Sequence, residues 1–221
     1  MSIADDLASS LDSLFGENAK EADIRTYLDT GLPELNKILS GYYDQGAAVG
    51  RMIEIFGPAS SGKTFISTML MAAAQKQGGI AGFSDHERSF KLDFAKTLGL
   101  NDHSSKFRYI RPKTFEESVD MAVQFCEIVR KKKLIPPEAP LVWVFDSVPA
   151  MIPHSVLYDD KGERRKVGTH NMRDKLMLAQ STSQYYPLLA QWAEDYNMTV
   201  ILLNQIRLDP GVMFGNPEKI P

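Results

Sequence analysis

Short apolar runs and longer runs with helical spacing follow one another along most of the chain. Residues 51–56, 79–84, 107–110, 141–145 and 199–203 are predicted strands, and the run at 141–145 is wholly apolar, as in a strand buried in a parallel sheet. Helical patterns cover 64–77, 90–98, 114–133 and 170–196. Because strands and helices alternate, the pattern predicts an α/β fold with a mostly parallel sheet flanked by helices.

Local signals refine the helical part of this prediction. A short helix at 33–39 lies between glycine turns. Thr114 and Glu117 form a capping box that opens the helix ending at Lys133. The basic residues 130–133 lie in the last turn of that helix, where the helix dipole favours positive charge. The alternative is that they contact nucleic acid. Pro187 predicts a break or a kink in the helix at 170–196.

The N-terminal segment predicts an amphipathic helix over residues 2–15. Its apolar face contains Ile3, Leu7, Leu11 and either Leu14 or Phe15, and residues 16–21 break the pattern. Such a face can pack on the core of its own chain or on a neighbouring subunit. We therefore predict an N-terminal helix and linker at 1–29, acting as a subunit-docking segment, and a core at 30–221.

Composition limits the classes of partner and compartment. The net charge is −3, from 25 basic and 28 acidic side chains, so any contact with DNA has to come from local loops. One cysteine, Cys126, excludes an internal disulfide framework and fits a reducing compartment. No apolar run approaches the ~20 residues of a membrane span. We expect a soluble, cytoplasmic protein with no membrane partner.

The clearest chemical signal is the segment from Gly57 to Thr64, GPASSGKT, between a predicted strand and a predicted helix. This is the phosphate-cradling pattern G-x-x-x-x-G-K-[ST], in which backbone N–H groups and the helix N-terminus face a phosphate. Lys63 is placed to bridge the β- and γ-phosphates, and the Thr64 hydroxyl to bind Mg²⁺. We predict that ATP binds at Gly57, Ser60, Ser61, Gly62, Lys63 and Thr64, and that Mg²⁺ binds at Thr64.

Two further strand ends supply acidic residues near this loop. Asp146 follows the apolar strand at 141–145, and at the C-terminal edge of a parallel sheet it would hold the waters of Mg²⁺. Asp85 and Glu87 follow the strand after the loop's helix. Hydrolysis needs a group that orients or deprotonates water, and position alone does not choose between these two acids.

With these motifs, the chain resembles the RecA-type recombinase family, in its bacterial and phage branch. The specific part is Asn204 to Arg207, NQIR, followed by Gly211 to Glu218, GVMFGNPE, which is similar to the start of that family's second DNA-binding loop. The resemblance extends from about Thr30 to Glu218. It implies a RecA-like P-loop ATPase core.

The resemblance also implies roles around the nucleotide. Glu87 matches the glutamate that activates water, and Phe94 matches an aromatic residue that stacks on adenine. Gln205 matches the glutamine that senses the γ-phosphate and relays its presence into the DNA loop. Lys91 replaces an acidic residue that commonly touches the adenine amino group, which leaves the preference for ATP over other nucleotides open.

Further roles are implied for contacts with DNA. Arg207 matches a basic loop residue near the DNA backbone, and Met213 and Phe214 match apolar residues that wedge between groups of stacked bases. The region 150–170 corresponds to the first DNA-binding loop, with a solvated surface loop as the alternative. We expect three of its basic residues to contact the phosphates of single-stranded DNA: Arg164, Arg165 and Lys166.

The implied function is that of a DNA-dependent ATPase and recombinase. It would form helical filaments of its own copies on single-stranded DNA and pair that strand with homologous duplex DNA. The sequence ends at Pro221, whereas family members continue with core strands and with lysines that reach the neighbour's ATP, so the resemblance places those groups outside these residues. A ring helicase or regulatory recombinase relative, and a truncated nucleotide-binding interaction module, are the alternatives.

Overall fold

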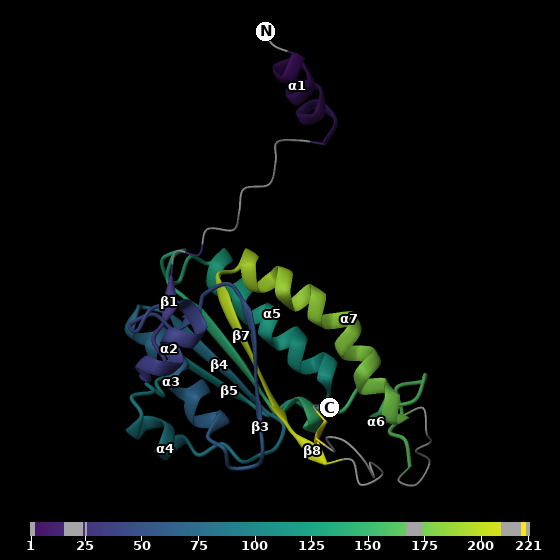
Figure 1. Ribbon diagram of the computed structural model, residues 1–221. Helices are drawn as coiled ribbons and strands as arrows, with labels where there is room; N and C mark the ends of the chain where they lie inside the picture. Colours follow the sequence, from purple (N-terminus) through teal and green to yellow (C-terminus); the bar gives the residue numbers. More distant parts are fainter. Residues whose placement is uncertain (1–2, 16–23, 25, 167–173, 209–217, 220–221) are drawn as a thin grey trace.

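A five-stranded parallel sheet forms the centre of the computed structural model, which describes residues 3–15, 24, 26–166, 174–208 and 218–219 (Figure 1). The strands lie in the order β3-β7-β6-β4-β5, and each neighbouring pair is parallel. Their bounds are β3 (Met52–Gly57), β4 (Ile80–Asp85), β5 (Phe107–Ile110), β6 (Leu141–Asp146) and β7 (Met198–Gln205). The predicted α/β fold with a parallel sheet is confirmed.

Helices cover both faces of the sheet, which explains why β4 and β6 are buried along their whole length and are mostly apolar (Figure 1). On β6, Val142 and Val144 belong to the buried cluster that includes residues of α3 (Lys63–Lys76) and α4 (Leu92–Thr97). Trp143 faces the other way, into the cluster that includes α5 (Phe115–Lys131) and α7 (Asp174–Asp195). Trp143 is 1% exposed, as expected for a core residue.

Several short elements were not predicted, because two to four residues cannot show a periodicity. They are β1 (Tyr27–Leu28), β2 (Ala47–Ala48), the 3-10 turn η1 (Val148–Ala150), α6 (His154–Leu157), β8 (Arg207–Leu208) and β9 (Glu218–Lys219). β1 pairs with β2 in antiparallel register, and Leu28 is fully buried, so part of the segment before residue 30 packs on the body. The predicted short helix is α2 (Pro33–Ser40).

α5 begins where its sequence predicts and ends at Lys131, two residues before the predicted end. At its N-terminus, Thr114 Oγ1 accepts a hydrogen bond from Glu117 N at 3.1 Å, and Glu117 Oε2 accepts one from Lys113 N at 2.7 Å. At its C-terminus, the half-buried Arg130 donates to the carbonyls of Pro136, Ala139 and Tyr196. Arg130 therefore fastens the end of α5 to two neighbouring segments and is not a free cation for nucleic acid.

α7 bears on the prediction of a break or a kink at Pro187. The helix is continuous from Asp174 to Asp195, so it has no break, and the kink stays a prediction. Residues on both sides of the proline pack into one buried cluster on the sheet, with Leu178 and Tyr185 before it and Leu189 and Ala193 after it. This packing stabilises a continuous helix against the loss of one backbone hydrogen bond.

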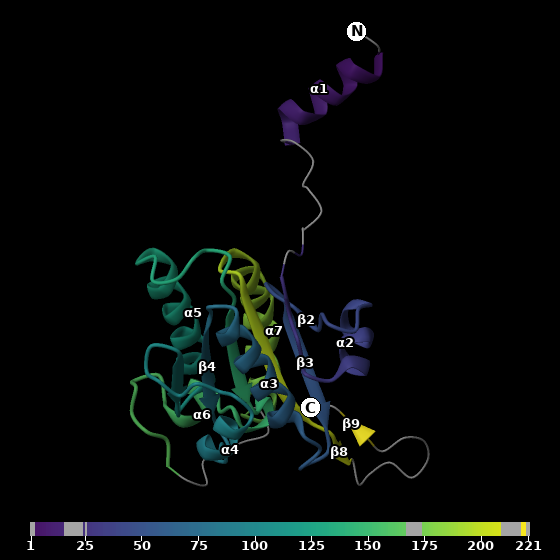
Figure 2. The ribbon, with the colours of Figure 1, turned by 90° about the vertical axis from the view of Figure 1, so that its left-hand side faces the viewer.

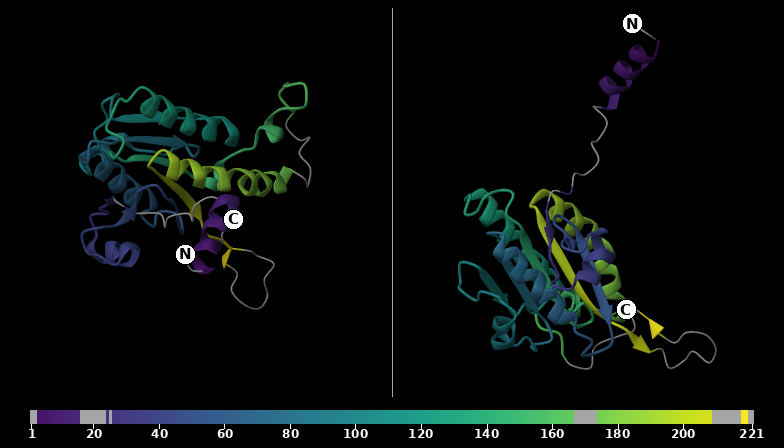
Figure 3. Two further views of the ribbon diagram at one scale, coloured as in Figure 1. Left: turned by 90° about the horizontal axis from the view of Figure 1, so that it is seen from above. Right: turned by 60° about the vertical axis from the view of Figure 1, so that its left-hand side comes forward.

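The N-terminal helix α1 (Ile3–Phe15) lies apart from the body of the molecule in Figures 1 and 2 and in the right panel of Figure 3. Leu7, Leu11 and Leu14 are 59%, 46% and 76% exposed. The predicted helix is therefore present, and its apolar stripe is not covered by its own chain. In the parts of the chain that the structure describes, no helix is long and apolar enough to cross a bilayer.

Candidate active site

The loop between β3 and α3 has the backbone that a phosphate cradle requires. Gly62 caps α3 in the left-handed conformation with φ +91°, which a residue without a side chain adopts at no steric cost. A Cβ on Gly57 would lie 2.8 Å from Ser61 Oγ, so this glycine permits the close turn. Because α3 begins at Lys63, its first N–H groups and positive dipole end face the loop.

Lys63 lies along this loop. Its Nζ donates hydrogen bonds to the carbonyls of Gly57 at 3.0 Å and Pro58 at 2.7 Å. The ammonium is thus held beside the same backbone that would surround a bound phosphate. Ser60 and Ser61, also predicted to take part, are exposed in the loop, and Ser60 has φ +60°.

The predicted metal ligands meet at the end of β6. Thr64 Oγ1 donates to Asp146 Oδ2 at 3.1 Å, although the residues are 82 positions apart. Asp146 is 4% exposed. A hydroxyl beside a carboxylate is an oxygen-donor set that suits Mg²⁺, with the remaining positions left for phosphate and water.

Burial raises the pKa of Asp146 to about 6, and the nearby negative charge of Glu87 acts in the same direction. A carboxylic acid with a raised pKa is neutral below that pH and charged above it, and only the charged form binds Mg²⁺ well. We therefore expect Mg²⁺-dependent nucleotide binding to tighten as the pH rises through about 6. Titrating a fluorescent ATP analogue across this interval, with and without Mg²⁺, measures the effect.

The matched control for this pH dependence is Asp146→Asn, which cannot titrate. Its Mg²⁺-dependent binding should be weak and flat across the same interval. A wild-type affinity that does not change with pH, or an Asp146→Asn variant with the wild-type profile, would contradict the assignment.

Asp85 and Glu87 have different surroundings. Asp85 is 1% exposed, and its two oxygens accept hydrogen bonds from Ser89 N and Phe90 N, both at 3.2 Å, and from Tyr109 Oη at 2.6 Å. Because Asp85 is buried and both its oxygens already accept hydrogen bonds, it is not placed to contact a water molecule from solvent. Glu87 is exposed at the end of the sheet where the P-loop lies. The geometry therefore favours Glu87 as the residue that could reach a water molecule.

Glu87 is in contact with the end of β7. Gln205 Nε2 donates to Glu87 Oε1 at 2.6 Å, and Ser147 Oγ donates to the same oxygen. The two predicted residues, which are 118 positions apart, are thus brought together. Phe94 lies on α4 and is 54% exposed, and Lys91 is exposed at the start of the same helix.

A protein-family model matches the part of the sequence that forms this site. The model of the RecA N-terminal domain matches residues 13–221. The chain belongs to the RecA family.

Individual RecA proteins support the same assignment. The RecA protein of Leptospira meyeri is 33% identical over 225 residues, an alignment that covers 97% of this chain and 53% of the relative. The RecA proteins of Geobacter sulfurreducens and Treponema denticola are 32% and 36% identical, covering 95% and 76% of this chain and 57% and 36% of their own lengths. The chain spans about half the length of the curated relatives it matches.

The segment expected to be the first DNA-binding loop is described up to Lys166. It begins at the end of η1 and contains α6 and a turn in which Tyr158 pairs with Arg164 as an isolated antiparallel bridge. Arg164 and Lys166 are exposed, whereas Arg165 Nη1 donates to the carbonyl of Ser155 at 3.0 Å. Arg164 is bridged to Tyr158, and Arg165 is bonded to Ser155 and, through its N–H, to Leu157, so these contacts of the two arginines lie within the turn's own segment.

The second loop is described only at its two ends. Arg207 is in β8, which pairs with β9 in antiparallel register, and its side chain lies outside the described part of the chain. Met213 and Phe214 also lie outside the described residues. The roles expected of these three residues in RecA-type DNA binding remain predictions.

One residue of the site was missed by sequence reasoning. Ser147 is 1% exposed and contacts Glu87, although nothing in the pattern around it suggested more than a turn after β6. The only available signal was its position directly after Asp146 at the C-terminal edge of the sheet.

Proposed function

We propose that this chain is the nucleotide- and DNA-binding part of an ATP-dependent recombinase, which assembles on single-stranded DNA and pairs it with homologous duplex. The observation that carries the proposal is the hydrogen bond from Gln205 Nε2 to Glu87 Oε1 at 2.6 Å. Gln205 ends β7, and the chain continues through β8 into the segment that corresponds to the family's second DNA-binding loop. Glu87, the acid that would act on water, is thus hydrogen-bonded to the end of the strand that continues into the proposed DNA-binding loop.

The chemistry follows from the side chains around the P-loop. Lys63 and the N–H groups at the start of α3 hold the phosphates and compensate their charge. Thr64 and Asp146 would hold Mg²⁺, which neutralises charge on the phosphate oxygens when bound. Glu87 accepts a proton from the attacking water, whose oxygen bonds to the γ-phosphorus while the bond to the β–γ bridging oxygen breaks.

Gln205 supplies the link to DNA. Its amide can donate either to Glu87, as in this structure, or to a γ-phosphate oxygen, and the second partner exists only while ATP is intact. A change of partner at the end of β7 alters the start of the following segment, which is how a nucleotide state can bias a DNA-binding loop. DNA bound to that segment would, by the same linkage, favour one partner of Gln205 over the other.

The test is phosphate release from ATP with and without oligo-dT, with Lys63→Ala as the control. We expect DNA-stimulated release that is lost in the control. Release that is insensitive to DNA would favour another RecA-like ATPase, and electron micrographs would then be examined for closed rings instead of filaments. Nucleotide binding without release would favour an interaction module.

Self-assembly is supported by two complementary surfaces. The first is the leucine stripe of α1, which is exposed at helical spacing and is accompanied by the acidic Asp6 and Asp12. The second is an apolar groove of about 660 Å³ between β5 and α5. Residues that line it include Ile110, Met121, Phe125, Ile128, Leu134 and Ile135, with Lys106 and Arg108 among its polar members. Charge and apolar character therefore both favour α1 of a neighbouring copy as the occupant.

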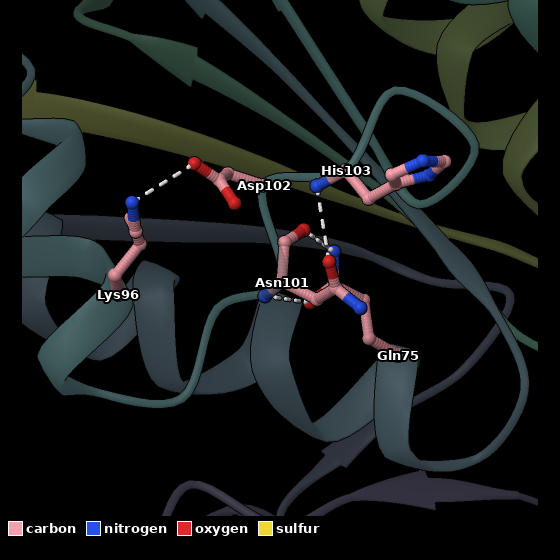
Figure 4. A network of polar contacts seen from close by, with 5 residues as sticks. All are labelled: Gln75, Lys96, Asn101, Asp102 and His103. Carbon is pink, nitrogen blue, oxygen red and sulfur yellow. Dashed lines mark hydrogen bonds and ion pairs between the residues drawn. The ribbon is translucent and has the colours of Figure 1, made fainter.

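Ser104, Ser105 and Lys106 line this groove, and the polar network in Figure 4 holds the residues just before them. Gln75, on α3, accepts a hydrogen bond from Asn101 N at 2.8 Å and donates to the carbonyls of Asn101 and Lys106, both at 2.9 Å. Lys96 pairs with Asp102 at 3.3 Å in the same region. These contacts fix the segment that precedes β5, so the groove is formed before any partner arrives.

We expect removal of residues 1–20 to abolish self-assembly and to leave nucleotide binding intact. Ile128→Asp should do the same from the other side, because a charge in the groove opposes burial of the leucines. The matched control is Ile38→Asp, an equally apolar exposed position on α2, outside the groove. Particle size by light scattering is the measurement. A size that neither the truncation nor Ile128→Asp reduces, or that Ile38→Asp reduces as much as Ile128→Asp, would contradict the docking.

A further inference from the structure

The dipeptide Asp146–Ser147 contacts both the backbone and the side chain of Glu87. The carbonyl of Asp146 accepts hydrogen bonds from His86 N at 2.7 Å and Glu87 N at 3.4 Å. The neighbouring Ser147 hydroxyl donates to Glu87 Oε1. Because Asp146 Oδ2 also accepts from Thr64, this dipeptide fixes the position of Glu87 relative to the P-loop helix.

The two donors to Glu87 Oε1 differ in how firmly they are held. Ser147 is 1% exposed at the start of η1, its carbonyl accepts from Ala150 N at 3.0 Å, and the next residue, Val148, is in the buried core. Gln205 is only half-buried, at a strand end that continues into the proposed DNA-binding segment. Ser147 is therefore a fixed contact, whereas the amide of Gln205 is free to change partner.

A glutamate at an exposed loop position has several accessible rotamers, and ordering it costs conformational entropy. If Gln205 transfers its hydrogen bond to a γ-phosphate, Glu87 loses one of its two described anchors at the moment when it has to face water. The hydroxyl of Ser147 remains on the same carboxylate oxygen and leaves Oε2 available for a proton from water.

We propose that Ser147 is a positioning residue for ATP hydrolysis, which holds the Glu87 carboxylate in place after Gln205 has turned to the nucleotide. This inference rests on the proposed ATPase function. It assigns Ser147 no contact with ATP or with Mg²⁺, and its effect is exerted through Glu87 alone. Loss of the hydroxyl should therefore change the rate of the chemical step and leave nucleotide affinity unaltered.

The test is steady-state hydrolysis by the full chain carrying Ser147→Ala. We expect kcat to fall about 10- to 100-fold, because small displacements of a catalytic group have effects of this order, with KM for ATP unchanged. Ser147→Thr, which keeps a hydroxyl on the same carbon, should retain most of the rate. The matched control is Ser84→Ala, which removes another buried hydroxyl, the acceptor of a 3.0 Å hydrogen bond from Trp143 Nε1, and should leave kcat unchanged.

A purely structural role would give a different result in a Glu87→Gln background. If Ser147 acts through Glu87, adding Ser147→Ala to Glu87→Gln lowers the residual rate no further. An equal loss in both backgrounds, or an unchanged kcat in Ser147→Ala alone, overturns the proposal. Thermal unfolding of each variant checks folding, and the double-variant comparison still decides if Ser147→Thr does not fold. A wild-type chain without any ATP hydrolysis instead rejects the proposed function, and the inference with it.

Discussion

Replacing Glu87 with Gln is expected to lower ATP hydrolysis by about 10²- to 10⁴-fold, which is the usual contribution of a positioned general base. An amide has nearly the same shape as the carboxylate and keeps an oxygen that can accept from Ser147, but it cannot take a proton from water. ATP binding should be unchanged, since the P-loop contacts do not involve this residue. Phosphate release and titration of a fluorescent ATP analogue measure the two quantities separately.

Asp85→Asn is the natural comparison for this variant, because the sequence offers both acids. It should retain far more hydrolysis than Glu87→Gln, since Asp85 is buried under three hydrogen bonds and does not face solvent. Retention of the wild-type rate by Glu87→Gln, together with its loss in Asp85→Asn, would reverse the assignment.

The second large effect is on stability. Asp85→Ala is expected to lower the free energy of unfolding by about 3 kcal/mol, because it removes three hydrogen bonds that converge on a buried carboxylate, each contributing about 1 kcal/mol. The donors are the N–H groups of Ser89 and Phe90 and the hydroxyl of Tyr109. These bonds close the turn that carries Glu87, so hydrolysis should fall together with stability. Urea unfolding of the variant and of the wild type measures the difference.

Two variants calibrate that measurement. Tyr109→Phe removes one of the three donors and keeps the ring that stacks on Phe90, so the expected loss is about 1 kcal/mol. Asp93→Ala removes an exposed carboxylate on α4 and should change stability by less than about 0.5 kcal/mol. If Asp85→Ala behaved like Asp93→Ala, the buried network would not contribute as described.

The architecture was predictable because its signals are local. Continuous apolar runs marked the buried parallel strands, and the P-loop pattern fixed where β3 ends and α3 begins. At Pro187 the helix does not break, because its packing on the sheet, through Leu189 and Ala193, outweighs the local rule. The family pattern at 204–218 then pointed to RecA more specifically than composition could.

The details of the site depend on contacts between distant parts of the chain. Asp85 and Glu87 are two positions apart with similar side chains. The family resemblance favoured Glu87, but the physical difference between them lies in the partners of Asp85, chiefly Tyr109 on β5. Ser147 gave no signal beyond its position after Asp146, because its partner Glu87 is 60 positions away. No periodicity or short motif encodes such pairs.

α5 reaches from the proposed assembly groove to the proposed catalytic turn. Along its length it carries Phe125 and Ile128 of the groove. At its N-terminal end, Ser118 Oγ is 3.0 Å from His86 Nε2, and Phe115 N donates to the carbonyl of Ile152 at the base of the first loop. A helix of 17 residues is about 25 Å long. In the proposed filament, a neighbour docked in the groove would therefore touch the same helix that contacts His86 and residue 152, so that one element would border both the subunit joint and the turn of the proposed general base.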